Sequence, residues 1–189
     1  DAKKAKGLVR RDVVRVVTPG TFTDADYLDA REPAYVMALS SNQNAATPKT
    51  GIAIADLSTG EFRVTEIADS HMSRSVIDEI RAVSPKELIL STELAETADP
   101  ELLPAGLTIS AVESWTFGLD HALRTLTDHF STSTLEGFGL TVEDNASGIA
   151  AAGAALTYLR GTQRGSLNHI QRLEVRDRTD YLSIDPSTF

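Results

Sequence analysis

The chain has 189 residues, of which 41% are hydrophobic and 24% are charged, and it carries a net charge of −9 and no cysteine. These values fit a globular body of one or two domains, and they exclude a disulfide scaffold, a thiolate metal cluster and a cysteine nucleophile. No apolar run approaches the ~18 residues of a membrane span, and no apolar stretch behind the first lysines fits a signal peptide. Because there is no initiating Met and the pattern stops abruptly at Phe189, we expect a part of a longer protein.

Charge is distributed unevenly along the chain. Residues 1–15 carry a net charge of +4, residues 16–159 carry −14 and residues 160–189 carry +1. Duplex DNA is bound mainly by Lys and Arg that neutralise phosphates, so the acidic middle is a poor candidate for DNA contact. The basic side chains at the amino end are either contacts to the DNA backbone or one face of an ordinary solvated strand: Lys3, Lys4, Lys6, Arg10, Arg11 and Arg15.

The amino-terminal residues predict the end of one domain and a linker. Residues 1–6 are typical of a last helical turn, and the β-branched residues 8–17 predict a strand. Residues 18–21 end that strand, because Pro lacks the ladder donor and Gly permits a turn. The acidic and polar residues 23–33 indicate an exposed linker at a domain boundary.

The next block predicts three antiparallel strands. Residues 34–39 form the first, and a polar loop over residues 40–50 follows it. Residues 51–57 and 61–67 flank a tight turn, which is typical of a hairpin.

A crossover is predicted after the hairpin. Apolar residues at helical spacing between Met72 and Val83 indicate an amphipathic helix, with Asp69 or Ser70 as its cap. Short apolar strands are expected at residues 87–91 and 107–112, separated by an acidic loop. A strand, helix, strand order implies that the sheet continues in parallel.

The last part of the chain predicts two further helices. Thr116 is expected to cap the first, whose apolar stripe runs from Leu119 to Phe130, and Asn145 to open the second, which is rich in alanine and ends near Thr162. Strand-like residues 172–175 and 181–184 have no obvious partners, so we expect them to pair with chain outside this sequence. The order of elements predicts an α/β fold with a ribonuclease H-like mixed sheet, antiparallel strands coming before parallel ones, and helices packed on it.

Asp56 is the most pointed candidate for chemistry, because it ends a strand and precedes a tight turn. In one interpretation it belongs to a divergent ribonuclease H-like metal-dependent nuclease or phosphotransferase, which needs further carboxylates within about 4 Å of the metal ions. In the other, Asp56 or Ser58 caps the turn, as Asx and Ser side chains commonly do.

Other motifs of catalysis are missing from the sequence. The four histidines have no paired ligand spacing, and there is no nucleophile elbow and no Gly-x-x-x-x-Gly-Lys loop. Trp115, the only Trp, is expected to anchor the core or a domain edge rather than to stack on bases.

Several segments, taken in order, resemble the MutS family of bacterial DNA mismatch-repair ATPases. The first is residues 6–21, and the later ones include residues 56–62, the Ala-rich helix, His169-Ile170 and residues 181–188. The motif positions that carry the resemblance are Thr18, Pro19, Gly20, Asp56, Ser58, Thr59, Gly60, Gly137, Phe138, Gly139, Thr162 and Gln163.

The resemblance implies a layout and a role. Residues 1–22 would end the mismatch-binding domain, residues 23–163 would be the linker and ribonuclease H-like connector domain, and residues 164–189 would begin the core and lever region. The connector would be non-catalytic, with no cofactor or metal of its own, since ATP and Mg bind elsewhere in such proteins.

The resemblance also implies partners. They would be MutL, other MutS domains, and mismatched DNA through domains outside this sequence, in a cytoplasmic protein without membrane contact. We expect Arg124, Thr125 and Asp128 to be solvent-facing and to offer part of the MutL surface, because they fall off the apolar stripe of their helix.

Overall fold

The computed structural model describes residues 18–19, 34–42, 47–162 and 167–176, and the statements below concern those residues. The basic side chains of residues 1–15, Gly20, Gln163, the linker at 23–33 and the strand expected at 181–184 lie outside them.

A single mixed sheet forms the centre of the described structure. Its order is β5-β4-β1-β2-β3-β6; β1, β2 and β3 pair in antiparallel fashion, whereas β4, β5 and β6 each run parallel to a neighbour. This arrangement confirms the predicted α/β, ribonuclease H-like fold. The strands are β1 (Tyr35–Asn42), β2 (Lys49–Asp56), β3 (Glu61–Ile67), β4 (Glu87–Ser91), β5 (Thr108–Val112) and β6 (Glu174–Val175).

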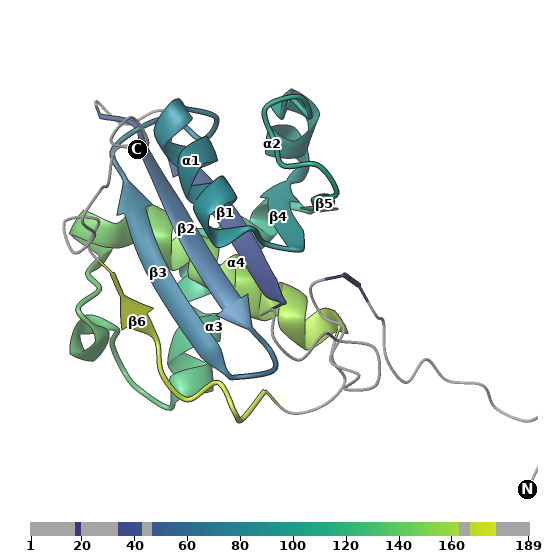
Figure 1. Cartoon of the computed structure of the whole chain (residues 1–189). Helices are drawn as coiled ribbons and strands as arrows, with labels where there is room; N and C mark the ends of the chain where they lie inside the picture. Colours follow the sequence, from purple (N-terminus) through teal and green to yellow (C-terminus); the bar gives the residue numbers. More distant parts are fainter. Residues whose placement is uncertain (1–17, 20–33, 43–46, 163–166, 177–189) are drawn as a thin grey trace, which may run out of the picture.

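Helices cover both faces of the sheet. In Figure 1, α1 lies on one face, and α3 and α4 lie on the other. The helices are α1 (Arg74–Val83), α2 (Thr92–Thr97), α3 (Leu119–Phe130) and α4 (Val142–Thr162), with 3-10 turns η1 (Ser114–Phe117) and η2 (Glu136–Phe138).

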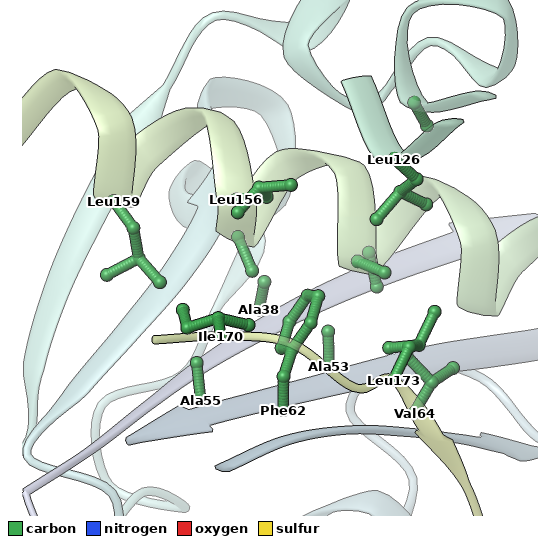
Figure 2. Close-up of a cluster of buried hydrophobic side chains, with 14 of the residues drawn as sticks. Ala38, Ala53, Ala55, Phe62, Val64, Leu126, Leu156, Leu159, Ile170 and Leu173 are labelled. Atoms are coloured by element: carbon green, nitrogen blue, oxygen red, sulfur yellow. The ribbon is translucent and has the colours of Figure 1, made fainter. Parts of the chain in front are cut away.

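Alternation along the strands creates two separate cores. In β2, Ile52 and Ile54 face α1, whereas Ala53 and Ala55 face α4. Small alanines on the second face let α4 lie close to the sheet, and a Cβ on Gly51 would come within 2.0 Å of the Ser147 carbonyl oxygen. Figure 2 shows the side chains that fill the space between α4 and the sheet.

The ends of several elements differ from those predicted. The β1–β2 ladder continues through Ser41↔Thr50 and Asn42↔Lys49, so much of the predicted polar loop is strand. Backbone pairing does not need apolar side chains, and the pattern of hydrophobicity therefore stopped short of the strand ends. The predicted acidic loop after β4 contains the short helix α2, capped by Ser91.

Two of the three predicted helix starts were wrong by a few residues. Ser73, and not Asp69 or Ser70, caps α1, since its hydroxyl oxygen accepts from the Val76 amide, whereas the Asp69 carboxylate accepts from the neighbouring Ser70 amide at 2.8 Å. Thr116 lies buried within η1, and α3 begins only after Gly118. Helix α4 begins at Val142, but its backbone is non-helical at Asn145, where two helical segments join, so the long Ala-rich segment does begin at the predicted residue.

The prediction that the strand near residue 174 lacks a partner was also wrong. β6 pairs with β3 through Arg63↔Glu174 and Val64↔Val175, and the Arg176 amide donates to the Val64 carbonyl at 2.8 Å. The two strands are far apart in sequence, and only the folded chain brings β6 to the free edge of β3.

Candidate functional site

Asp56 closes the β2–β3 turn. One carboxylate oxygen accepts from the Ser58 amide at 2.8 Å and from its hydroxyl at 2.7 Å, and the other accepts from the Thr59 hydroxyl at 3.1 Å. The Gly60 amide donates to the Asp56 carbonyl at 2.9 Å. The side chain is 1% exposed. Asp56 therefore has the capping role that the sequence offered as one of two interpretations.

A second buried carboxylate, Glu87, binds three distant segments. It begins β4 and is fully buried. One of its oxygens accepts from the hydroxyls of Ser110 and Tyr158, each at 2.5 Å, and the other accepts from the Thr18 hydroxyl at 2.6 Å. Burial raises the pKa of the Tyr158 hydroxyl, and its hydrogen bond to Glu87 raises it further, so Tyr158 remains a donor at neutral pH.

The two buried carboxylates cannot converge on one metal ion. Asp56 follows Ile54 by two residues and shares its face, toward α1, whereas Glu87 shares the face of Ile89, toward α4. Within the described ranges, no group of three or more His, Asp or Glu side chains is placed to hold a metal. The nuclease interpretation needs at least two more carboxylates beside Asp56, and this part of the chain does not supply them.

The predicted partner residues on α3 do not all face solvent. Arg124 and Asp128 are exposed, but Thr125 is 6% exposed, which contradicts the prediction for it. Thr125 lies next to Leu126, on the side of α3 that faces α4, and contacts the His121 ring at 3.4 Å. It was misplaced because α3 buries a wider arc than its apolar residues alone indicate.

The remaining motif residues have structural positions. Phe138 lies in η2 between Gly137 and Gly139, and its ring packs on Phe130 with 5.0 Å between centroids. Thr162 is buried at the end of α4, where its hydroxyl donates to the Tyr158 carbonyl at 3.1 Å.

The residues after α4 form a segment that we call the strap, residues 167–176. Leu167, Ile170 and Leu173 are buried in the core under α4, and Figure 2 shows the last two beside Phe62. The strap passes so close to the β2–β3 turn that a Cβ on Gly60 would lie 2.5 Å from the His169 carbonyl oxygen.

A histidine on α3 also holds the strap. The His129 ring nitrogen Nε2 lies 2.8 Å from the Ile170 carbonyl oxygen, and burial lowers the pKa of His129. A neutral ring that carries its proton on Nε2 donates this bond.

Sequence reasoning missed both Glu87 and the strap. An acidic residue at the start of an otherwise apolar strand is a signal for a buried polar contact, but it does not indicate the partners. The spacing of three between Leu167, Ile170 and Leu173 is a signal for a buried segment without regular structure.

Trp115 does not anchor the core, which was one of the two positions that the sequence suggested; the other, a domain edge, stays a prediction. Its side chain is 60% exposed, and its ring meets the His121 ring edge-on with 5.0 Å between centroids. It lies in η1, between β5 and α3, where Thr116 and not Trp115 is the buried residue.

Comparison with known proteins decides the family. A family model described as MutS domain II matches residues 34–171. The chain belongs to the MutS family. It is 40% identical over 192 residues to the DNA mismatch repair protein MutS of Symbiobacterium thermophilum, and 40% identical over 187 residues to that of Syntrophobacter fumaroxidans. These alignments cover 100% and 98% of this chain, but only 21% and 20% of the relatives, so this MutS chain spans about a fifth of their length.

The solved structures that resemble this chain include a viral resolvase. The fowlpox virus resolvase in complex with Holliday junction DNA aligns with a TM-score of 0.39 and 12% sequence identity, covering 66% of this chain and 97% of the resolvase chain. In the part of the MutS chain that the structure describes, no helix is both long and apolar enough to cross a membrane.

Proposed function

We propose that this chain is the non-catalytic connector of a bacterial MutS protein and couples the mismatch-binding region before it to the core and ATPase regions after it. The observation that carries the proposal is that both ends of the connector are fastened to one α/β body. Thr18 at the entry is hydrogen-bonded to buried Glu87, and the strap at the exit extends the sheet at β3.

This double attachment suits mechanical coupling. A force on the entering segment acts on Glu87, which is held by Ser110 of β5 and Tyr158 of α4. Helix α4 runs on toward the strap, whose residue Ile170 packs in the core that α4 covers. Displacement at one end therefore reaches the other through rigid, packed elements.

The chemistry of the site supports a role without catalysis. Both buried carboxylates are already occupied by hydroxyl or amide donors of the chain itself. The sequence has no Gly-x-x-x-x-Gly-Lys loop, so ATP and Mg²⁺ would bind to other parts of the longer protein. Mismatched DNA would likewise be bound by other MutS domains, and we place the protein in the cytoplasm.

Coupling is testable in the longer MutS protein with Glu87→Gln. We expect mismatch binding and basal ATP hydrolysis to persist separately, and the change in ATP turnover on mismatch binding to be reduced severalfold. The matched control is Glu136→Gln, which removes the same charge from an exposed position on η2. A Glu87 variant with unchanged mismatch-dependent ATP turnover would contradict the proposal.

A surface for MutL is the second part of the proposal. Arg124 and Asp128 lie one turn apart on the outer face of α3 and are exposed, so they are available to a partner. Thr125 takes no direct part, because it is buried against α4.

Purified MutL and the 189-residue chain test this surface directly. We expect Arg124→Glu to lower the yield of cross-links to MutL severalfold, and Arg74→Glu, an exposed charge reversal on α1, to leave it unchanged. Equal cross-linking of both variants would place the MutL contact elsewhere and leave the coupling role standing.

A further inference from the structure

A pocket lies at the opposite edge of the sheet from Asp56. The parallel strands β1, β4 and β5 end there, and the carboxyl ends of parallel strands are where α/β folds place their ligands. The pocket has a volume of about 430 Å³. We call it the carboxyl-edge pocket. Its hydroxyl-bearing lining residues are Ser40, Ser41, Ser91, Thr97 and Ser114.

The lining of the carboxyl-edge pocket is suited to a hydrogen-bond donor with positive charge. Glu93 lies in the wall, and no Lys or Arg is among the described residues that form it. The Ser114 hydroxyl donates to the Glu93 carboxylate, and this bond lowers the pKa of Glu93, which keeps it anionic at neutral pH. Burial lowers the pKa of His71 on the same wall, so its ring adds no positive charge at neutral pH.

One polar atom in the wall is buried without a hydrogen-bond partner among the described residues. The Ser41 hydroxyl oxygen is buried and makes no hydrogen bond to the described residues. A buried hydroxyl without a partner costs free energy, and a donor or acceptor from a bound molecule would remove that cost. Of the pocket's hydroxyls, Ser91 is already used as the cap of α2.

A large exposed aromatic side chain is the chain neighbour of one of the pocket's lining residues. Trp115 directly follows Ser114 and is 60% exposed. Trp is among the residues that contribute most to binding in protein interfaces, and an exposed indole favours cationic side chains. Glu113 and Asp120 are also exposed on this stretch of the chain, and they repel phosphate groups.

We propose that the carboxyl-edge pocket receives a lysine or arginine side chain from a partner protein, with Glu93 accepting from its cationic end and Trp115 contacting the segment that carries it. The pocket is distinct from the α3 surface that we propose for MutL. The inference rests on the pocket's own lining and does not depend on the coupling role.

The single Trp makes the proposal testable by fluorescence on the 189-residue chain. The probe is the peptide acetyl-Gly-Leu-Arg-Leu-Gly-amide, and its control carries citrulline, a neutral isostere, in place of arginine. We expect a saturable change in Trp115 emission with the arginine peptide, and about tenfold weaker binding of the citrulline peptide, because a charge-assisted hydrogen bond is lost.

Variants locate the binding in the pocket. We expect Glu93→Gln to weaken binding of the arginine peptide about threefold, as for an exposed ion pair, and Glu136→Gln to leave it unchanged. Ser41→Ala should weaken binding without lowering the unfolding midpoint, since it removes an unpaired hydroxyl. Equal binding of the two peptides, no response at millimolar peptide, or equal effects of the two Glu variants would each overturn the proposal.

Two further experiments test for other occupants of the carboxyl-edge pocket. Spermidine binding as tightly as the arginine peptide would indicate a small polyamine site and overturn the proposal. In the longer MutS protein, a cysteine introduced by Thr97→Cys should react with maleimide at the rate seen in this chain, which has no cysteine of its own. A blocked reaction there would mean that another MutS domain covers the pocket, which also overturns it.

Discussion

Asp56 and Glu87 are both buried carboxylates at the ends of β-strands, yet they organise the molecule differently. The Asp56 carboxylate accepts hydrogen bonds from Ser58 and Thr59, within three residues of it in the turn that it caps. The donors to Glu87 lie 23, 69 and 71 residues away, in β5, at the entry of the chain and in α4. The first stabilises a local turn, whereas the second holds three segments to one point of the sheet.

The difference shows where coupling between regions resides in this molecule. A local cap can be lost with little effect beyond the hairpin. The loss of a shared acceptor has wider effects, because it leaves several half-buried donors without that partner. The predictions that follow test whether Glu87 and the strap act across the fold and Asp56 acts only within its turn.

The largest effect is expected from Glu87→Ala. The variant leaves the hydroxyls of Thr18, Ser110 and Tyr158 without their acceptor and creates a cavity, so we expect the free energy of unfolding to fall by about 3 kcal/mol. Urea denaturation measures it, with Glu136→Ala on the exposed η2 turn as control. The control should change the free energy by less than about 0.5 kcal/mol. Equal losses of unfolding free energy in the two variants would show that Glu87 stabilises the fold no more than an exposed glutamate does.

Gly60→Ala is expected to have the next largest effect, because it acts on both the turn and the strap. Gly60 has φ +76° and lies against the His169 carbonyl. Gly106 has a similar φ of +82°, but a Cβ added there would have no neighbour within 4 Å. Gly106→Ala therefore measures backbone strain alone, about 1 kcal/mol, and Gly60→Ala should cost about 2 kcal/mol or more. Urea unfolding of both variants compares them. Equal losses of unfolding free energy would mean that the strap moves away from the added methyl group at no cost in stability.

A double-mutant cycle sharpens the contrast between the two carboxylates. We expect Asp56→Asn to cost about 1 kcal/mol, and its effect to add to that of Tyr158→Phe within about 0.5 kcal/mol, because the two sites share no partner. Glu87→Gln and Tyr158→Phe should instead be non-additive, since they remove parts of one hydrogen bond. Additivity in both pairs would show that the Glu87 contacts act independently.

The smallest effect is expected in the pH dependence of stability, through the hydrogen bond between His129 and the strap. Burial lowers the pKa of His129 from its ordinary value of 6.5, and the bond to the Ile170 carbonyl opposes this only in part. The unfolded chain therefore takes up the proton first as pH falls, so stability should decrease as pH drops through 6.5 toward the lower folded-state value.

Unfolding by urea at neutral pH and near pH ~5.5 measures this slope. His129→Gln keeps a donor for the Ile170 carbonyl and should flatten the slope, leaving the part that belongs to His71, whose pKa burial also lowers. A slope unchanged by the substitution would assign the pH dependence to other groups.

The elements that could be predicted from the sequence are those that depend on residues close together in the chain. The hairpin around Asp56, the crossover helix and the strand at Glu87–Ser91 followed from turn chemistry and hydrophobic periodicity. These signals are local, and the order of elements was enough to predict the sheet.

The features that were missed depend on contacts between distant segments. The pairing of β6 with β3, the partners of Glu87 and the burial of Thr125 arise from packing that no short window of sequence contains. The exposure of Trp115 belongs with these features, because which side of η1 is buried is decided by packing, and Thr116 takes the buried position.

Amide hydrogen exchange of the 189-residue chain tests the central claim most directly, namely that the exit segment belongs to the same body as the sheet. The Arg176 amide donates to the Val64 carbonyl of β3, across the β3–β6 pair. We predict that Arg176 and the β3 amides exchange with similar protection, as parts of one cooperative unit. Arg176 exchanging at the rate of a free amide while β3 remains protected would contradict the account.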